Sequence, residues 1–147
     1  MTEAVFWMLI SLLDWDESGD DDAVVAPVIE ELSKRPVEDI RKFDEILASK
    51  LYALDTKAHA QNIGEYAYVE DEYFSVDWFL YARCVVVANG KDLYEAVLQN
   101  PTSFPKDMEF ESLLYIAGEA YALRTGEDYD HATQLSWETY SNKGGWN

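Results

Sequence analysis

The sequence predicts an all-α protein that folds as a single compact domain of about six to eight helices. Apolar residues recur at spacings of three and four along most of the chain, which is typical of helices with one buried face. Only Tyr66–Val69 has the composition of a strand, and a lone strand would leave its backbone groups unpaired, so a helix is predicted there as well. With 147 residues, of which 48% are apolar, the chain can bury a core without disulfides or metal.

Three helices are predicted in the first third of the chain. Thr2 can cap the first helix, and the acidic run 14–22 follows as a solvated turn. Pro27 lies inside the second helix, so this helix either starts late or bends. Pro36 suits the first position of the third helix, which has the clearest apolar stripe. The stripe consists of Ile40, Phe43, Ile46, Leu47, Leu51 and Leu54.

The middle of the chain contains the helix that we expect to be most buried. Residues 56–68 are small and polar and permit a helix without demanding one. Ser75 then suits the N-cap of a helix that reaches Val87 and is apolar on almost all sides. Gly90 is expected to end it as a left-handed C-cap.

The last third is predicted to hold three more helices. Asp92 can cap a short one, which the pair Asn100-Pro101 ends. A long amphipathic helix is predicted from Phe110 to Leu123, closed by Gly126.

The C-terminal end is predicted to be only partly ordered. A last short helix is expected to cover Tyr129–Tyr140, with Trp137 packing back on the core. Residues 141–147 have no periodicity and are expected to fray, which leaves residues 1–140 as the single helical domain.

The apolar stretch Val5–Leu13 lacks the features of a targeting signal. It follows Glu3 rather than a basic region, and it runs directly into acidic residues. Nine residues are also too few to span a bilayer. We therefore expect a cytoplasmic protein without membrane attachment.

Acidic residues dominate the charge. There are 29 acidic and 11 basic residues, which gives a net charge of −18 and a pI of about 4.2. Such a surface repels phosphates and anionic lipids, so neither nucleic acid nor membrane is expected as a partner. Residues 59–82 contain five acids and no Lys or Arg, whereas residues 83–106 are near neutral. The acidity either confers solubility or forms a face for a basic protein partner.

Few residues could carry catalysis or hold a metal. His59 and His131 are far apart in sequence, and Cys84, the single cysteine, is expected in the core. The run Asp14–Asp22 matches the start of a calcium-binding loop, but Val25 occupies the position of the last carboxylate ligand. The run could therefore bind a cation only weakly. We therefore expect no cofactor and no structural or catalytic metal, and the sequence favours a protein that is not an enzyme.

The best candidate for a binding site is a segment where aromatic and acidic residues alternate outside the apolar stripes. Aromatic anchors surrounded by charge are typical of protein interfaces. The candidate partner-binding residues are Glu65, Tyr66, Tyr68, Glu70, Asp71, Glu72, Tyr73, Asp77 and Trp78.

Two segments resemble the bacterial DUF4240 family. Phe6-Trp7-Met8-Leu9-Ile10 is similar to that family's opening Phe-Trp-x-Leu-Ile, and Ser75–Arg83 is similar to its Ser-Asp-Asp-x-Phe-x-x-Phe-Arg pattern. The resemblance covers about residues 2–126. Val76 departs from the family's first Asp, and Glu72-Tyr73 replaces Gly-Gly. The family has no known function, so the resemblance implies a soluble bacterial helical domain and assigns no catalytic residue.

Two hypotheses for function follow. The leading one is an acidic domain that masks a basic surface of a protein partner, most concretely an immunity protein that neutralises a bacterial toxin. The alternative is a small enzyme or ligand-binding domain of the DUF4240 type, with a pocket lined by His59, Asp77, Trp78 and Arg83. A deep pocket with a strongly perturbed ionisable group would favour the alternative.

Overall fold

Helices and loops make up the whole chain, and no strand is present, which confirms the all-α prediction. The computed structural model describes all residues 1–147. The eight helices are α1 (Glu3–Ile10), α2 (Asp21–Ser33), α3 (Val37–Ala53), α4 (Lys57–Ala60), α5 (Val76–Ala88), α6 (Lys91–Gln99), α7 (Ile116–Thr125) and α8 (Lys143–Trp146). Three short 3-10 turns lie at Trp15–Glu17, Pro101–Ser103 and Glu111–Tyr115.

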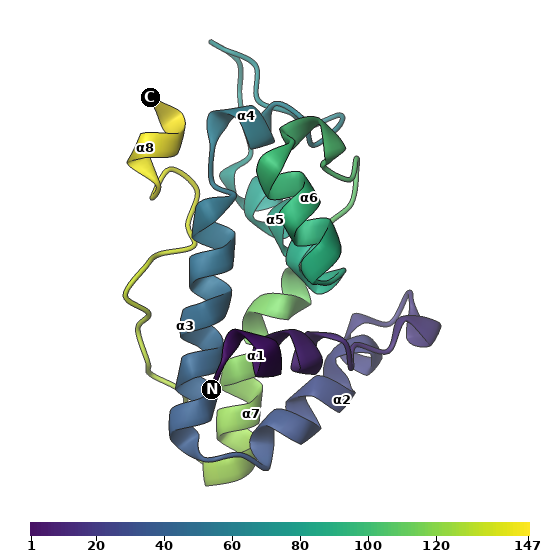
Figure 1. Cartoon of the computed structure of the whole chain (residues 1–147), viewed down its shortest axis with the longest axis vertical. Coiled ribbons are helices and arrows are strands. Elements are labelled where there is room, and N and C mark those ends of the chain that lie inside the picture. The colour runs from purple at the N-terminus through teal and green to yellow at the C-terminus, as the bar shows by residue number, and fades with distance from the viewer.

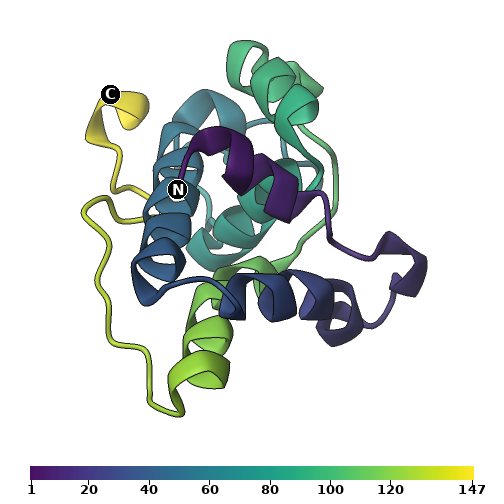
Figure 2. The ribbon, with the colours of Figure 1, turned by 60° about the horizontal axis from the view of Figure 1, so that its bottom comes forward.

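The core forms around α3, which contributes its apolar stripe, and α5, which is buried on nearly all sides. The long α3 is the spine of the molecule, with α7 and α2 packed at its lower half and α4, α5 and α6 gathered at its upper half (Figure 1). Helix α1 crosses in front of these layers (Figures 1 and 2). As predicted, α5 is buried on nearly all sides, with every residue from Ala82 to Ala88 removed from solvent.

Several helix boundaries follow from the caps that the sequence indicates. The hydroxyl of Thr2 accepts from the N–H of Val5, and that of Ser75 accepts from the N–H of Trp78. Asp20 caps α2, so this helix starts well before Pro27 and does not start late. Gly126 ends α7 in the left-handed region, with φ of +75°, as predicted.

Other boundaries differ from the prediction. Pro36 is the N-cap of α3 rather than its first residue. Gly90 has φ of +102° but an extended ψ, so it begins α6 as its N-cap, and Asn89 ends α5. The helix expected from Phe110 starts as a 3-10 turn and becomes α-helical only at Ile116. Between residues 56 and 68 only α4 is helical, and Tyr66–Val69 is irregular.

The largest correction concerns the C-terminal segment. The expected helix at Tyr129–Tyr140 is absent, and residues 127–142 instead form an irregular strap that runs along the outside of α3 (Figures 1 and 2). The tail that we expected to fray instead forms α8 and packs against α4 and the residues that follow α3. Both segments are held by side chains of residues 44–55, which lie some 85–90 positions earlier in the chain.

None of the helices combines the length and the apolar character that crossing a membrane requires.

Candidate functional site

The structure places the nine predicted site residues in one region. Seven of them lie in the loop between α4 and α5, which we call the acidic loop (residues 61–75), and Asp77 and Trp78 lie in the first turn of α5. The acidic loop projects beyond α4 at the top of Figure 1. Because the candidates are nearly consecutive in sequence, their proximity was predictable without the tertiary fold.

A close contact with the segment before α7 fixes the base of the acidic loop. The side chain of Asp107 accepts from the N–H of Glu65 at 2.7 Å, and its own N–H donates to the carbonyl of Ile63 at 3.0 Å. Gly64 makes this approach possible, because it has φ of +106° and a Cβ there would lie 2.9 Å from the backbone nitrogen of Asp107. The base of the loop is therefore fixed by hydrogen bonds from its backbone to both the side chain and the backbone of Asp107.

Two of the four aromatic candidates are free to meet a partner. The side chain of Tyr73 is 91% exposed and that of Tyr66 is 51% exposed. Trp78 is half-buried and its ring meets the ring of Tyr66 edge-on at 5.0 Å. Tyr68 is also half-buried, in an edge-on contact with Trp146 of α8 at 5.4 Å. Tyr68 and Trp78 therefore support the loop, whereas Tyr73 and Tyr66 are available as anchors.

The acidic residues of the loop are nearly free of ion pairs. Lys57 of α4 pairs with Glu70 at 3.2 Å and lies 5.6 Å from the centre of the Tyr68 ring. The carboxylates of the other acidic candidates, in the loop and at the start of α5, form no ion pair or hydrogen bond within the chain. They are Glu65, Asp71, Glu72 and Asp77, and all four are exposed.

A second exposed group of aromatic and acidic residues surrounds Trp15. Its ring is 42% exposed, packs on Phe110 at 5.3 Å and borders a hollow of about 250 Å³ together with Asp21 and Glu109. The sequence predicted a solvated turn here, with weak cation binding left open, and no binding surface. The signal that could have identified it is a tryptophan inside a run of acids.

Two carboxylates of the acidic run around Trp15 serve as caps. Asp14 accepts from the N–H of Asp16, and Asp20 accepts from the N–H of Ala23. Nowhere in the chain are three or more His, Cys, Asp or Glu side chains arranged to hold a metal ion.

The pocket proposed around His59, Asp77, Trp78 and Arg83 does not form. His59 is buried, with its ring nitrogens 2.6 Å from the Thr56 hydroxyl and 2.9 Å from the Val97 carbonyl. Arg83 is also buried and donates to the carbonyl of Leu51 at 2.9 Å. None of the four residues lines any of the five main hollows of the surface.

Burial explains the electrostatics of α5. It lowers the pKa of Arg83 to about 10 and raises the pKa of the Cys84 thiol well above its ordinary value. A thiol with such a pKa stays protonated and inert, so Cys84 is a core residue.

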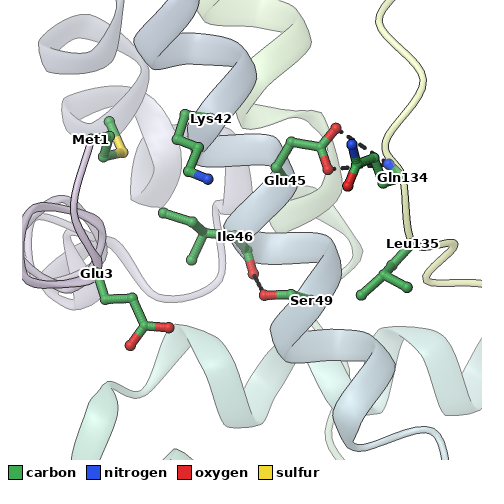
Figure 3. Close-up of a pocket in the computed structure, with 8 residues that line it drawn as sticks. All are labelled: Met1, Glu3, Lys42, Glu45, Ile46, Ser49, Gln134 and Leu135. Atoms are coloured by element: carbon green, nitrogen blue, oxygen red, sulfur yellow. Dashed lines mark hydrogen bonds between the residues drawn. The ribbon is translucent and has the colours of Figure 1, made fainter.

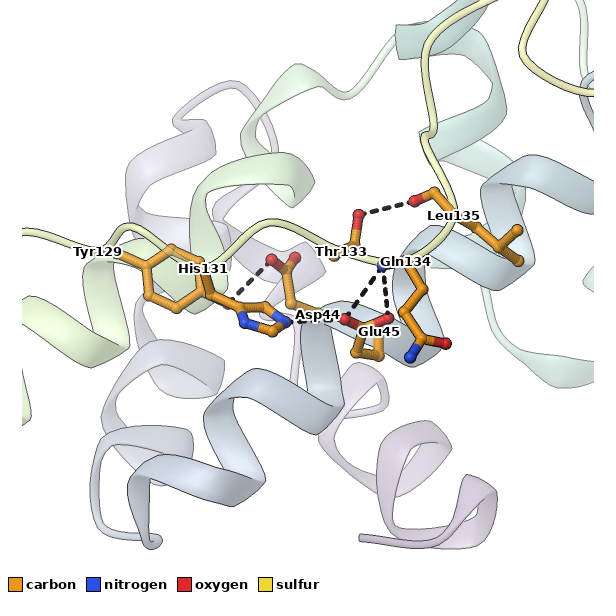
Figure 4. A network of polar contacts seen from close by, with 7 residues as sticks. All are labelled: Asp44, Glu45, Tyr129, His131, Thr133, Gln134 and Leu135. Atoms are coloured by element: carbon orange, nitrogen blue, oxygen red, sulfur yellow. Dashed lines mark hydrogen bonds and ion pairs between the residues drawn. The ribbon is translucent and has the colours of Figure 1, made fainter.

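Helix α3 contains, where the strap crosses it, the one carboxyl group with a strongly raised pKa. Asp44 is only 3% exposed, and its Oδ2 accepts from the hydroxyl of Tyr129 at 2.9 Å (Figure 4). Its other oxygen, Oδ1, is buried and has no hydrogen-bond partner. Burial raises the pKa of Asp44 from its ordinary value of 3.8 to about 6, against the lowering effects of Tyr129 and His131.

The residue after Asp44 holds the next part of the strap. Glu45 pairs with Nε2 of His131 at 2.8 Å and accepts from the N–H of Gln134 at 3.1 Å (Figure 4). Sequence reasoning missed this site because its parts are far apart in the chain. A signal was present, since Asp44 lies four residues after Ile40 and three before Leu47, on the buried face of the helix.

Hollows lie on both sides of the strap. One of about 450 Å³ lies beside Asp44, between the strap and α7, and a smaller one of about 300 Å³ shares Asp44 with it. A third, of about 320 Å³, lies between the start of α1, α3 and the strap (Figure 3). Lys42, Glu3 and Glu45 give the third hollow mixed charge, so it shows no preference for one sign of ligand.

Comparison with known proteins gives one match. A family model described as a protein of unknown function, DUF4240, matches residues 1–123. No curated protein and no solved structure matches the chain significantly.

Proposed function

Because the chain belongs to the DUF4240 family, whose description assigns no function, we propose from its surface that it is an acidic protein-binding domain. In this proposal the acidic loop and the start of α5 cover a basic surface of a protein partner. The most concrete form is an immunity protein that neutralises a toxin, since a nuclease toxin has a cationic face for its nucleic acid substrate.

The observation that carries the proposal is the exposure of Tyr73 between unpaired acids. A tyrosine ring that is 91% exposed contributes nothing to the fold, and Asp71 and Glu72 beside it have no cation to neutralise them. Aromatic residues of this kind provide most of the binding energy at protein interfaces. Neighbouring carboxylates accelerate encounter with a basic partner and disfavour acidic ones.

The anchored base of the loop adds a second argument. The contacts of Asp107 with Ile63 and Glu65 hold one end, and Ser75 caps α5 at the other end. An interface that is ordered before binding loses less conformational entropy on association. The geometry therefore suits a preformed surface.

The direct test compares two variants with the same change in net charge. In the loop variant, Glu65→Gln, Asp71→Asn, Glu72→Gln and Asp77→Asn remove four negative charges from the acidic loop and α5. In the control variant, the same chemical changes are made at exposed, unpaired acids elsewhere. These are Glu17→Gln, Asp22→Asn, Glu127→Gln and Asp128→Asn.

Tagged wild-type and variant proteins are used to capture partners from the source cells at low and high salt, and captured proteins are identified by mass spectrometry. We expect a basic protein that is retained by wild type and control but lost with the loop variant. Its association rate should fall as ionic strength rises. Equal loss with both variants would indicate only general charge attraction, and a partner that is acidic or insensitive to salt would contradict the proposal.

A second pair of variants, Tyr73→Ala and a control at another exposed side chain, tests the aromatic anchor. Tyr73→Ala is expected to weaken binding of the captured partner by about 30-fold, since anchor residues contribute about 2 kcal/mol or more. Leu123→Ala, at an exposed apolar side chain of α7, should leave affinity unchanged. Equal affinities for Tyr73→Ala and wild type would show that Tyr73 does not contact the partner.

A further inference from the structure

We infer that the hollow beside Asp44 is a binding site for an organic cation, an ammonium or guanidinium group. The site lies between α3, α7 and the strap, away from the acidic loop, so it is independent of the function proposed above (Figure 1).

The unsatisfied oxygen of Asp44 is the first reason. The carboxylate faces the strap, where the Tyr129 hydroxyl binds Oδ2, while Oδ1 is buried without a partner (Figure 4). A buried carboxylate oxygen without a hydrogen bond is destabilising, and a positively charged N–H donor is its strongest possible partner.

The walls of the hollow give the second reason. Aromatic rings of Tyr115, Tyr129 and Trp137 line it together with His131, and such rings attract cations to their faces. Glu119 of α7 adds a second carboxylate. Neither this hollow nor the smaller one beyond Asp44 contains a Lys or Arg, and His131, which lines both, is paired with Glu45, so no lysine or arginine side chain of the chain lies there to pair with Asp44.

The size of the hollow limits what can bind. About 450 Å³ lies at the lower end of the range for small-molecule sites. It is large enough for one amine, or for one lysine or arginine side chain. Because only Oδ1 of Asp44 is free, we expect a single charged hydrogen bond at the bottom of the site, with ring contacts above it.

The main experiment measures binding of agmatine, which has both an ammonium and a guanidinium group. Two-dimensional NMR of the full chain would follow the indole N–H of Trp137 and the amides of the strap during titration. We expect saturable shifts confined to the strap and α7. Butyrate, an anion of similar size, should cause none.

Variants separate the site from general charge attraction. Asp44→Asn keeps the shape of the side chain and an acceptor for Tyr129, and it should weaken agmatine binding at least tenfold. Tyr115→Leu removes an exposed ring and should weaken it about threefold. Glu127→Gln, an exposed acid of the strap outside the hollow, should have no effect.

A capped Gly-Arg-Gly peptide distinguishes the two sources of the cation. If the peptide binds at least as tightly as agmatine, the ligand is a protein side chain; if only agmatine binds, it is a free amine. The inference is overturned if neither causes saturable shifts, as expected if a water molecule satisfies Oδ1. It is also overturned if both Asp44→Asn and Tyr115→Leu bind agmatine as wild type does.

Discussion

Two buried carboxylates, eleven residues apart, hold the C-terminal segment in different ways. Asp55 follows α3 and is completely buried, and both its oxygens accept hydrogen bonds. The donors are the N–H groups of Tyr140 and Asn142 at 3.2 and 3.0 Å and the indole N–H of Trp146 at 2.8 Å. This cluster explains why the tail is ordered.

Asp44, inside α3, is nearly as buried but receives one donor, the hydroxyl of Tyr129. Burial is similar at the two sites, so the two carboxylates differ in the number of hydrogen-bond donors that they receive. Asp55 is a structural anchor, whereas Asp44 retains binding capacity. Burial of an acid therefore does not by itself distinguish a structural role from a binding role.

The comparison is tested most strongly by Asp55→Ala. This change removes three hydrogen bonds to a buried charge and leaves their donors unpaired, so we expect a loss of roughly 3–5 kcal/mol in the free energy of unfolding. Urea unfolding measures the loss, and faster amide exchange of residues 140–146 would locate it. Wild-type stability in the variant would show that Asp55 does not anchor the tail.

Asp44→Asn should increase the free energy of unfolding rather than lower it, and the size of the increase should depend on pH. The folded-state pKa of about 6 is above the ordinary 3.8, so the folded protein binds more protons than the unfolded chain between these values. Stability contributed by this group therefore falls as pH rises from about 4 to about 6. The variant should be more stable than wild type by roughly 3 kcal/mol at pH 7.5, and this gain should vanish near pH 3.5. Urea unfolding at both pH values measures it, and an equal effect at both would contradict the assignment.

The smallest loss of stability is expected when the close contact between α8 and Asp55 is disturbed. A Cβ on Gly145 would lie 2.7 Å from the Asp55 carbonyl oxygen, whereas one on Gly144 would meet only Asn142 at 3.8 Å. Gly145→Ala should therefore cost about 1 kcal/mol, because the terminal turn can shift to relieve the contact. Gly144→Ala serves as the matched control and should be close to wild type in urea unfolding. Identical stability of the two variants would show that α8 does not pack tightly.

Local signals predicted much of the fold correctly. The caps Thr2 and Ser75, the apolar stripe of α3 and the glycine that ends α7 act within a few residues, so a short window of sequence contains the cause and the effect. The acidic loop was predictable as a candidate surface for the same reason.

The strap was not predictable in this way. The segment around Tyr129–Tyr140 has a composition that permits a helix, but its backbone and side chains find partners on Glu45 and Asp55 instead. Tertiary contacts of this kind override weak local propensity. The hollow beside Asp44 exists only once strap and α7 are in place.

The amino-acid sequence alone determined the helical class, the buried character of α5 and the concentration of acids near Tyr73, since these depend on composition and short-range spacing. Only the tertiary structure decided that Asp44 and Asp55 hold one C-terminal segment, and that one of them keeps a free oxygen. The physical reason is that hydrogen bonds between residues some 85 positions apart depend on how the whole chain packs, which no local pattern specifies.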